Sequence, residues 1–280
     1  MKGVLAAALT PMRADLSIDG EAFAAHCRSL LEAGCHGLAI FGTTGEANSL
    51  SVAERIEAWE ALVDDGIPGD ALLPGTGACA LPDALELSRA ALAVGAAGVL
   101  ALPPFYYKGV SDDGLFRFFA ELIERVGDDR LRLFLYHIPP MAVVGFSPEL
   151  IRRLIDAYPG IVVGTKDSSG DAARIERICR EFPELTVFAG TEKYLLDTLN
   201  WGGDGCISAT VNVLAREARA VYDLWAAGED ATAAQAALTQ RREYLDGFPT
   251  IPALKALVGW EHLRPPLQPL DPELARTISS

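Results

Sequence analysis

Residues 37–65 read GLAIFGTTGEANSLSVAERIEAWEALVDD and contain one complete strand-and-helix unit. The apolar run Gly37–Gly42 has the length of a buried strand and ends in turn residues. Ser51 and Glu54 then form a capping-box pattern, in which each side chain bonds the backbone N–H of the other, so a helix is expected over Val52–Asp65. A strand followed by a helix in this way is the building unit of parallel α/β folds.

The same unit recurs along the whole chain. Apolar runs that end in turn residues follow one another at spacings of roughly 20 to 35 residues, the length of one strand-and-helix unit. The eight predicted strands are Val4–Thr10, Gly37–Gly42, Ala71–Gly75, Gly98–Pro103, Leu131–Ile138, Ile161–Lys166, Thr186–Gly190 and Gly205–Thr210. Alternating units of this number favour a TIM (β/α)8 barrel, and a doubly wound open sheet is the alternative.

Helix signals separate the predicted strands and continue after them. Phe23–Ala33 and Ala84–Val94 are each followed by a glycine, and Ser147-Pro148 opens a helix over Glu149–Tyr158. After about residue 213 the strand signal stops, and further helices are predicted at Leu214–Ala227, Asp230–Asp246 and Ile251–Val258. We therefore predict a barrel domain over residues 1–212, followed over 213–280 by the last barrel helix and a C-terminal helical extension.

Composition and charge limit the classes of function. The 280 residues are 50% hydrophobic, and the formal charge of −14 argues against a nucleic-acid partner. The apolar stretch at residues 1–12 is interrupted by Pro11 and is too short to span a bilayer. The five cysteines are scattered without a CxxC motif, which favours a cytoplasmic protein, and the four histidines lie too far apart in sequence for a metal site of the usual kind.

Lys166 is the first candidate for chemistry, because it ends the apolar run Ile161–Thr165. A cation at the end of a buried strand is costly unless it is neutral, paired or functional. Burial favours the neutral form of an amine, which is the nucleophile that forms an imine with a carbonyl compound. The alternative is a lysine that reaches solvent and pairs with Asp167. Other lysines are less well placed, since Lys2 and Lys255 are expected to lie away from the carboxyl ends of the strands.

The segment Gly42-Thr43-Thr44-Gly45-Glu46 directly follows a predicted strand. Its glycines let the backbone turn and present N–H groups, and the two hydroxyls add further donors, so the segment suits a small carboxylate. An ordinary turn between a strand and a helix is the alternative interpretation.

Tyr136 ends the predicted strand Leu131–Ile138, which neighbours the strand of Lys166 in a barrel. The two side chains can therefore face one interior volume, where a phenol beside an imine can transfer protons during carbon–carbon cleavage. The alternative is a core aromatic whose hydroxyl bonds to the backbone. His137 is expected to point away by strand alternation. The pair Tyr106-Tyr107 is typical of a loop cover or an interface patch.

In order along the chain, these residues resemble the motifs of the dihydrodipicolinate synthase and N-acetylneuraminate lyase family of class I pyruvate aldolases. The similarity covers essentially the whole chain. It rests on Leu9-Thr10-Pro11, Gly42–Glu46, Tyr106-Tyr107, Tyr136-x-x-Pro139, Lys166–Gly170 and Gly205–Ser208. The resemblance implies a TIM barrel with a helical C-terminal extension, usually assembled as a homotetramer, and a reaction that needs no cofactor.

The resemblance also implies roles for individual residues. Lys166 is expected to form the Schiff base with the 2-oxo acid, and Tyr136 to transfer protons with Thr43 as its relay partner. Tyr107 matches a tyrosine that the family often lends across a subunit interface, in a tetramer or dimer.

Further matched positions concern substrate binding. Thr44, together with Gly42 and the backbone of Ile207, is expected to hold the carboxylate of the 2-oxo acid. Ser168 and Glu192 match positions that bind sugar hydroxyls in the sialic acid lyases.

Two departures from the family pattern narrow the substrate. Dihydrodipicolinate synthases usually carry an arginine just after Tyr-x-x-Pro, where it clamps a second carboxylate, but residues 140–144 here are Pro-Met-Ala-Val-Val. A bidentate arginine clamp is not replaced by an apolar side chain, so lysine biosynthesis is disfavoured. Ala209 stands where the sialic acid lyases have a serine, which argues against a full set of hydroxyl-binding residues.

We therefore predict a Schiff-base-forming, pyruvate-dependent aldolase or lyase that makes or cleaves a 2-oxo acid, such as a 2-keto-3-deoxy sugar acid, with an aldehyde as the second substrate. One alternative is a dehydratase, hydratase or deaminase that uses the same lysine imine. Another is a non-catalytic member of the family that binds 2-oxo acids. The intact set of Lys166, Tyr136 and Thr43 favours an enzyme over the non-catalytic alternative.

Overall fold

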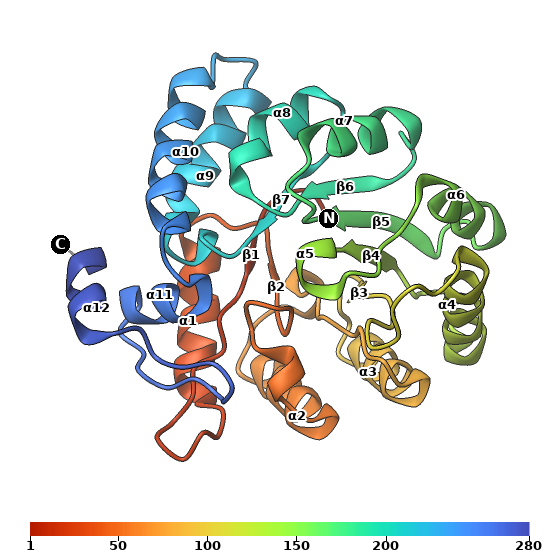
Figure 1. The fold of residues 1–280 in the computed structure, drawn as a ribbon, viewed down its shortest axis with the longest axis horizontal. Coiled ribbons are helices and arrows are strands. Elements are labelled where there is room, and N and C mark those ends of the chain that lie inside the picture. Colours follow the sequence, from red (N-terminus) through yellow and green to blue (C-terminus); the bar gives the residue numbers. More distant parts are fainter. Residues whose placement is uncertain (280) are drawn as a thin grey trace.

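The computed structural model describes residues 1–279, and at its centre a parallel sheet curls into a barrel (Figure 1). Over these residues the strands are β1 Gly3–Ala7, β2 Gly37–Ala39, β3 Val99–Ala101, β4 Leu133–His137, β5 Val162–Asp167, β6 Thr186–Ala189 and β7 Gly205–Ser208. They pair in the order β2-β1-β7-β6-β5-β4-β3, and every pairing is parallel.

The segment at residues 72–75 occupies the eighth position of the barrel, between β2 and β3. Leu72 forms a parallel bridge to β2, and Gly75 forms one to β3. The prediction of a regular strand at Ala71–Gly75 is wrong in this respect, because Ala71 ends a 3₁₀ turn and Pro74 has no N–H to donate to a ladder. The segment still connects the two edges of the sheet. The predicted TIM-barrel fold is thereby confirmed.

Helices surround the barrel and continue beyond it. They are α1 Gly20–Glu32, α2 Val52–Asp64, α3 Leu81–Ala93, α4 Asp112–Val126, α5 Pro139–Ala142, α6 Pro148–Ala157, α7 Ala172–Glu181, α8 Leu195–Asn200, α9 Val211–Ala226, α10 Thr232–Asp246, α11 Thr250–Leu257 and α12 Pro272–Ser279. Short 3₁₀ turns lie at η1 Ala47–Ser49, η2 Gly69–Ala71 and η3 Glu192–Tyr194.

The residues predicted to begin and end helices do so in the structure. Ser51 and Glu54 form the complete capping box at the start of α2, and the Ser147 side chain caps α6. Gly34 and Gly95, directly after the ends of α1 and α3, have φ angles of 101° and 72°, in the left-handed region that glycine adopts without a steric cost. The predicted helix boundaries lie within a few residues of those observed.

Two apolar layers hold the barrel. The inner layer fills the barrel itself, and it includes Leu5, Leu73, Phe134, Phe188 and Ile207. The outer layer is larger and lies between the strands and the helices. Because successive residues of a strand point to opposite faces, each strand contributes to both layers.

The C-terminal helices gather on one side of the barrel (Figure 1). Helix α9 packs on β1 and β7, α10 packs on α9, and α11 contacts α9, α10 and α12. Across residues 1–279, no helix has the length and apolarity needed to cross a membrane.

Candidate active site

Lys166 and Tyr136 face each other at the carboxyl ends of neighbouring strands. They are directly paired in the register of β5 and β4. The Lys166 Nζ donates a hydrogen bond to the Tyr136 hydroxyl at 3.3 Å and lies 4.4 Å from the centre of its ring. Both side chains are buried, with exposed fractions of 5% and 3%. The structure thus places an amine and a phenol in one enclosed volume, as the alternation of the two strands predicts.

The charge of Lys166 has no carboxylate partner within the described residues 1–279. The neighbouring Asp167 is committed elsewhere, because its carboxylate accepts hydrogen bonds from Ser169 and from the guanidinium of Arg174 at 2.8 Å. The alternative in which Lys166 reaches solvent and pairs with Asp167 is therefore wrong. The amine therefore stands beside the Tyr136 phenol with no carboxylate bound to it, a position from which it can react with a carbonyl compound.

The segment Gly42–Glu46 brings two hydroxyls to the same place. The Thr43 Oγ1 lies 3.4 Å from the Tyr136 hydroxyl, and Thr44 is buried beside it at the wall of the pocket. The segment is held in shape by the Thr10 hydroxyl, which donates to the Gly45 carbonyl at 2.8 Å. Glu46 has a φ of 57°, a backbone conformation that is costly for a residue other than glycine and that clusters at functional sites.

These residues line one cavity of about 740 Å³. Barrel residues in its wall are Thr43, Thr44, Tyr136, Ile138, Met141, Lys166, Ser168, Gly190 and Ala209. The rest of the wall comes from the C-terminal part of the chain, at residues 249–252 and 266–271 and at Leu274. Sequence reasoning missed this second group, because no strand or motif marks it. Within the described residues, Lys166 is the only cationic side chain that lines the cavity.

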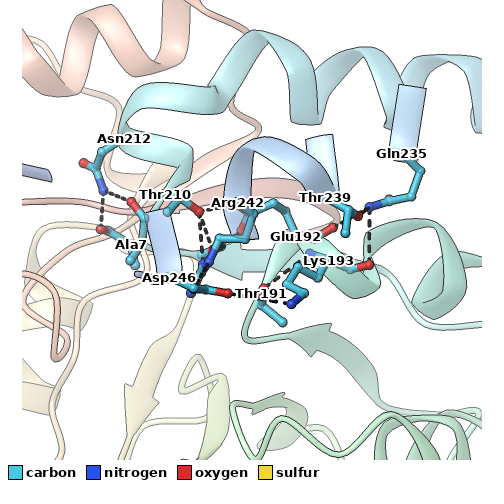
Figure 2. Close-up of polar contacts among 12 residues, drawn as sticks. Ala7, Thr191, Glu192, Lys193, Thr210, Asn212, Gln235, Thr239, Arg242 and Asp246 are labelled. Carbon is cyan, nitrogen blue, oxygen red and sulfur yellow. Dashed lines mark hydrogen bonds and ion pairs between the residues drawn. The ribbon is translucent and has the colours of Figure 1, made fainter. Parts of the chain in front are cut away.

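Glu192 lies outside this cavity, in a separate buried cluster (Figure 2). Its carboxylate accepts hydrogen bonds from the hydroxyls of Ser208 and Thr210 and pairs with Arg242 of α10 at 3.4 Å. The side chain is fully buried, so its oxygens are occupied by protein donors. Arg242 also donates to both hydroxyls, at 3.2 and 3.1 Å. This cluster joins α10 to the ends of β6 and β7.

Three further residues predicted for the site, Ile207, Gly42 and Tyr107, are not among the residues that line the cavity. Ile207 is buried in the inner layer of the barrel, and the Gly42 carbonyl accepts the N–H of Ala47 at 3.2 Å. Tyr107 is 73% exposed in the loop after β3, with its ring against that of Tyr106. In the isolated chain, Tyr107 is therefore not in the wall of the cavity.

His137 points away from the cavity, as predicted from strand alternation. Its Nδ1 accepts the backbone N–H of Phe146 at 3.0 Å. Burial lowers the pKa of the imidazole to about 4, while the nearby Asp167 carboxylate opposes this shift. A neutral ring is required for this hydrogen bond, because a protonated imidazole has no acceptor.

Lys255 is the residue whose position differs most from expectation. The sequence predicts that it lies away from the carboxyl ends of the strands, but its Nζ pairs with Glu46 in the loop that follows β2. The prediction fails because the first residues of α11 line the same cavity as Lys166, so that Lys255 meets a loop residue about 210 positions earlier in the chain. Within the described residues, no group of three or more His, Cys, Asp or Glu side chains is arranged to hold a metal ion.

The sequence and the fold of this chain are similar to those of known proteins along nearly their whole length. A model of the dihydrodipicolinate synthetase family matches residues 1–278. A DapA-like lyase of Chloroflexus aurantiacus is 36% identical, over 97% of this chain and 93% of that protein. The solved structure of dihydrodipicolinate synthase from Agrobacterium tumefaciens superposes with a TM-score of 0.91 at 35% identity, covering 100% of this chain and 97% of that one. YagE, a prophage protein of Escherichia coli K12 solved in complex with pyruvate, superposes with a TM-score of 0.90 at 28% identity, covering 100% and 96%.

Proposed function

Because the chain belongs to the dihydrodipicolinate synthetase family and is a class I aldolase or lyase of that family, we propose that it forms a Schiff base between Lys166 and pyruvate or a longer 2-oxo acid. The observation that carries this proposal is the buried pair of Lys166 and Tyr136, whose nitrogen and oxygen lie 3.3 Å apart. The pyruvate complex of YagE supports the choice of 2-oxo acid. The reaction makes or breaks a carbon–carbon bond to an aldehyde.

The proposed mechanism uses the side chains in the order in which they surround the amine. The amine of Lys166 attacks the 2-oxo carbon, and the carbinolamine takes the proton of the Tyr136 hydroxyl and loses water. The product is an iminium ion that withdraws electrons from C3, and Tyr136 is left able to accept a proton. In cleavage, the C3–C4 bond breaks and its electron pair forms an enamine, while the 4-hydroxyl proton passes to Tyr136 and the aldehyde leaves. Protonation of the enamine and addition of water then release pyruvate and restore the amine.

Thr43 and Thr44 take supporting parts in this proposal. Thr43, at 3.4 Å from the Tyr136 hydroxyl, relays its proton, and Thr44 donates to the carboxylate of the 2-oxo acid with the backbone of Gly42 and Ile207. Ser168 lines the same cavity and is available for a hydroxyl of the longer substrate. Glu192 accepts hydrogen bonds from two hydroxyls and pairs with Arg242, so we propose that it supports the end of β7, next to Ala209 of the cavity wall, rather than contacting a sugar.

We propose that the second substrate is an aldehyde without a carboxylate, so that the cleaved compound is a 2-keto-3-deoxy or related 4-hydroxy-2-oxo acid. The cavity wall beyond Tyr136 is made of Ile138 and Met141, and residues 140–144 carry no charge. A second carboxylate would find no cation other than Lys166 in the described wall of the cavity, and Asp271 in that wall would repel it. This argues against the reaction of the dihydrodipicolinate synthases.

We also propose a cytoplasmic homotetramer or dimer that works without a cofactor. All five cysteines are free thiols, four of them buried, which suits a reducing compartment. The exposed Tyr106 and Tyr107 are aromatic side chains of the kind enriched in interfaces, where Tyr107 would complete the site of a partner subunit.

Borohydride reduction in the presence of pyruvate tests the imine. We expect mass spectrometry to find the reduced adduct on the peptide that contains Lys166, and to find it neither in the Lys166→Ala variant nor on the peptide of Lys108, a loop lysine used as the control. An unmodified Lys166 peptide would refute the proposal. A screen of 2-keto-3-deoxy acids then identifies the reaction, because free pyruvate means cleavage, whereas loss of water from an intact carbon chain means a dehydratase.

A further inference from the structure

The outer wall of the active-site cavity comes from a segment far along the chain from the catalytic strands. Residues 266–271 lie between α11 and α12 and contribute side chains such as Leu267 and Leu270 to the wall. These residues form no strand or helix, so the backbone hydrogen bonds of regular structure do not hold them in place. Other contacts must position them over the barrel.

A fully buried ion pair lies next to the start of this segment. Glu46 ends the segment Gly42–Glu46, and its carboxylate pairs with the Nζ of Lys255 on α11, with neither side chain exposed to solvent. The same two side chains bond to the backbone just before the wall segment. The Lys255 Nζ donates to the His262 carbonyl at 2.9 Å, and the Glu46 carboxylate accepts the N–H of Arg264 at 2.9 Å. The pair therefore fastens residues 262–264 to the loop that follows β2.

Arg264 adds a second attachment at the same place. Its guanidinium donates to the carbonyls of Leu16 and Ser49, at 2.9 Å each, and bonds to the carboxylate of Glu54. Its hydrogen bond to that carboxylate lowers the pKa of Glu54 to about 2. Residues 262–264 are thus fixed to the barrel immediately before the wall segment begins.

The wall itself has a hollow on its other side. A second cavity of about 740 Å³ lies between the wall segment, α11 and α12, and it shares Pro252, Pro269 and Leu270 with the active-site cavity. The wall is therefore a thin layer with space behind it. Because close packing does not hold it from behind, its distance from Lys166 depends on how its ends are attached.

We propose that the Glu46–Lys255 pair positions residues 266–271 as the wall that limits the length of the 2-oxo acid held on Lys166. Glu46 belongs to the segment that carries Thr43 and Thr44, so one rigid unit links the carboxylate-binding end of the cavity to the wall at its other end. The space between the two ends then selects the substrate by length. This inference rests on the proposed imine at Lys166 and names what determines the specificity of that site.

The length of the bound acid can be measured without knowing the natural aldehyde. Borohydride trapping on Lys166 is measured separately with 2-oxooctanoate and with pyruvate. The readout is the trapping efficiency with 2-oxooctanoate divided by that with pyruvate. In the wall variants Leu267→Ala and Leu270→Ala we expect this ratio to rise about tenfold, the usual effect of a change in the size of an apolar pocket. Pyruvate is too short to reach the wall, so its trapping is the internal reference within each variant.

The Glu46–Lys255 pair, called the anchor below, is tested by replacing both charged side chains at once. The double variant Glu46→Leu with Lys255→Met leaves no unpaired buried charge, so we expect it to keep the fold. It removes the two bonds that hold the His262 carbonyl and the Arg264 N–H, while the bonds of the Arg264 guanidinium remain. We expect its ratio to rise as in the wall variants. Arg219→Met, which removes a partly exposed ion pair with Asp223 on α9, is the control and keeps the wild-type ratio. Thermal melting of each variant confirms that it is folded before trapping.

The possible results separate the two proposals. Wild-type ratios in Leu267→Ala and Leu270→Ala would overturn the role of the wall, and a wild-type ratio in the folded double variant would overturn the role of the anchor. An equal rise in Arg219→Met would overturn the inference as well, since the effect would then be general. Absence of any pyruvate adduct in the wild-type protein is a different result, because it refutes the proposed imine itself.

Discussion

Replacing Tyr136 with phenylalanine removes one oxygen atom from the centre of the site and leaves the ring in place. The hydroxyl lies 3.3 Å from the Lys166 Nζ and 3.4 Å from the Thr43 Oγ1, so it is the group that can exchange protons with both. Both distances exceed the usual ranges, which are about 2.7 to 3.2 Å from nitrogen to oxygen and about 2.5 to 3.0 Å between hydroxyls. Each bond therefore contributes about 1 kcal/mol or less to stability. Tyr136→Phe should therefore fold normally.

The expected loss of activity is much larger than the loss of stability. A positioned proton-transfer group contributes about 10²- to 10⁴-fold to a rate, which corresponds to about 3 to 5 kcal/mol in the transition state. Lys166 makes the covalent bond of the imine, and solvent can supply the proton for the loss of water, so the borohydride adduct with pyruvate should still form in Tyr136→Phe. The enamine, in contrast, requires removal of a proton from C3, which should be slowed by the full factor.

Exchange of the methyl protons of pyruvate in D₂O measures the enamine step directly, because each enamine that is protonated again carries deuterium. Nuclear magnetic resonance follows this exchange without any aldehyde. Tyr158→Phe is the matched control, since the Tyr158 hydroxyl donates to Glu124 at 2.7 Å on the surface, outside the cavity. Wild-type exchange in Tyr136→Phe would refute the assignment of proton transfer to Tyr136. Loss of exchange in Tyr158→Phe as well would show that the assay reports a general effect.

Three further perturbations test other parts of the site. Thr43→Val should slow the same exchange by about twofold to tenfold, the effect of one hydrogen bond to Tyr136, with unchanged borohydride trapping. Lys255→Met alone leaves the Glu46 carboxylate buried without a counter-ion, so urea denaturation should find the free energy of unfolding lowered by about 3 to 5 kcal/mol. Adding Glu46→Leu should restore most of this loss, and an equal loss in the single and the double variant would contradict the reasoning. The pKa of His137 in the folded protein is about 4, below its ordinary 6.5, so the unfolded chain takes up a proton first as the pH falls. The contribution of His137 to stability is therefore present above pH 6.5 and is lost as the pH falls toward 4, by about 3 kcal/mol in all. His137→Asn should flatten this acid slope in denaturation experiments, and an unchanged slope would exclude His137 as its source.

Some features of the site could be predicted because they depend on short stretches of chain. Strand alternation alone puts Tyr136 inside the barrel and His137 outside, and both positions are observed. Helix ends are also set by neighbouring residues. Ser51 and Glu54 form the capping box of α2, and Gly34 has the left-handed backbone that follows the end of α1, so the helix ends predicted from them are nearly correct. The strand at residues 71–75 was predicted less well, because Pro74 interrupts a ladder whose partners are set by the closure of the barrel.

The sequence by itself determined the repeated strand-and-helix units, and therefore the barrel, and it determined that Lys166 and Tyr136 end neighbouring strands. Only the tertiary structure decided what surrounds them. The contact of Glu46 with Arg264 joins residues 218 positions apart, and the bond between Glu192 and Arg242 joins residues 50 apart. No local period specifies such pairs, because they depend on where α10 and α11 pack after the barrel has closed. For that physical reason the position of the buried amine beside Tyr136 could be predicted from the chain, whereas the C-terminal wall of its cavity could not.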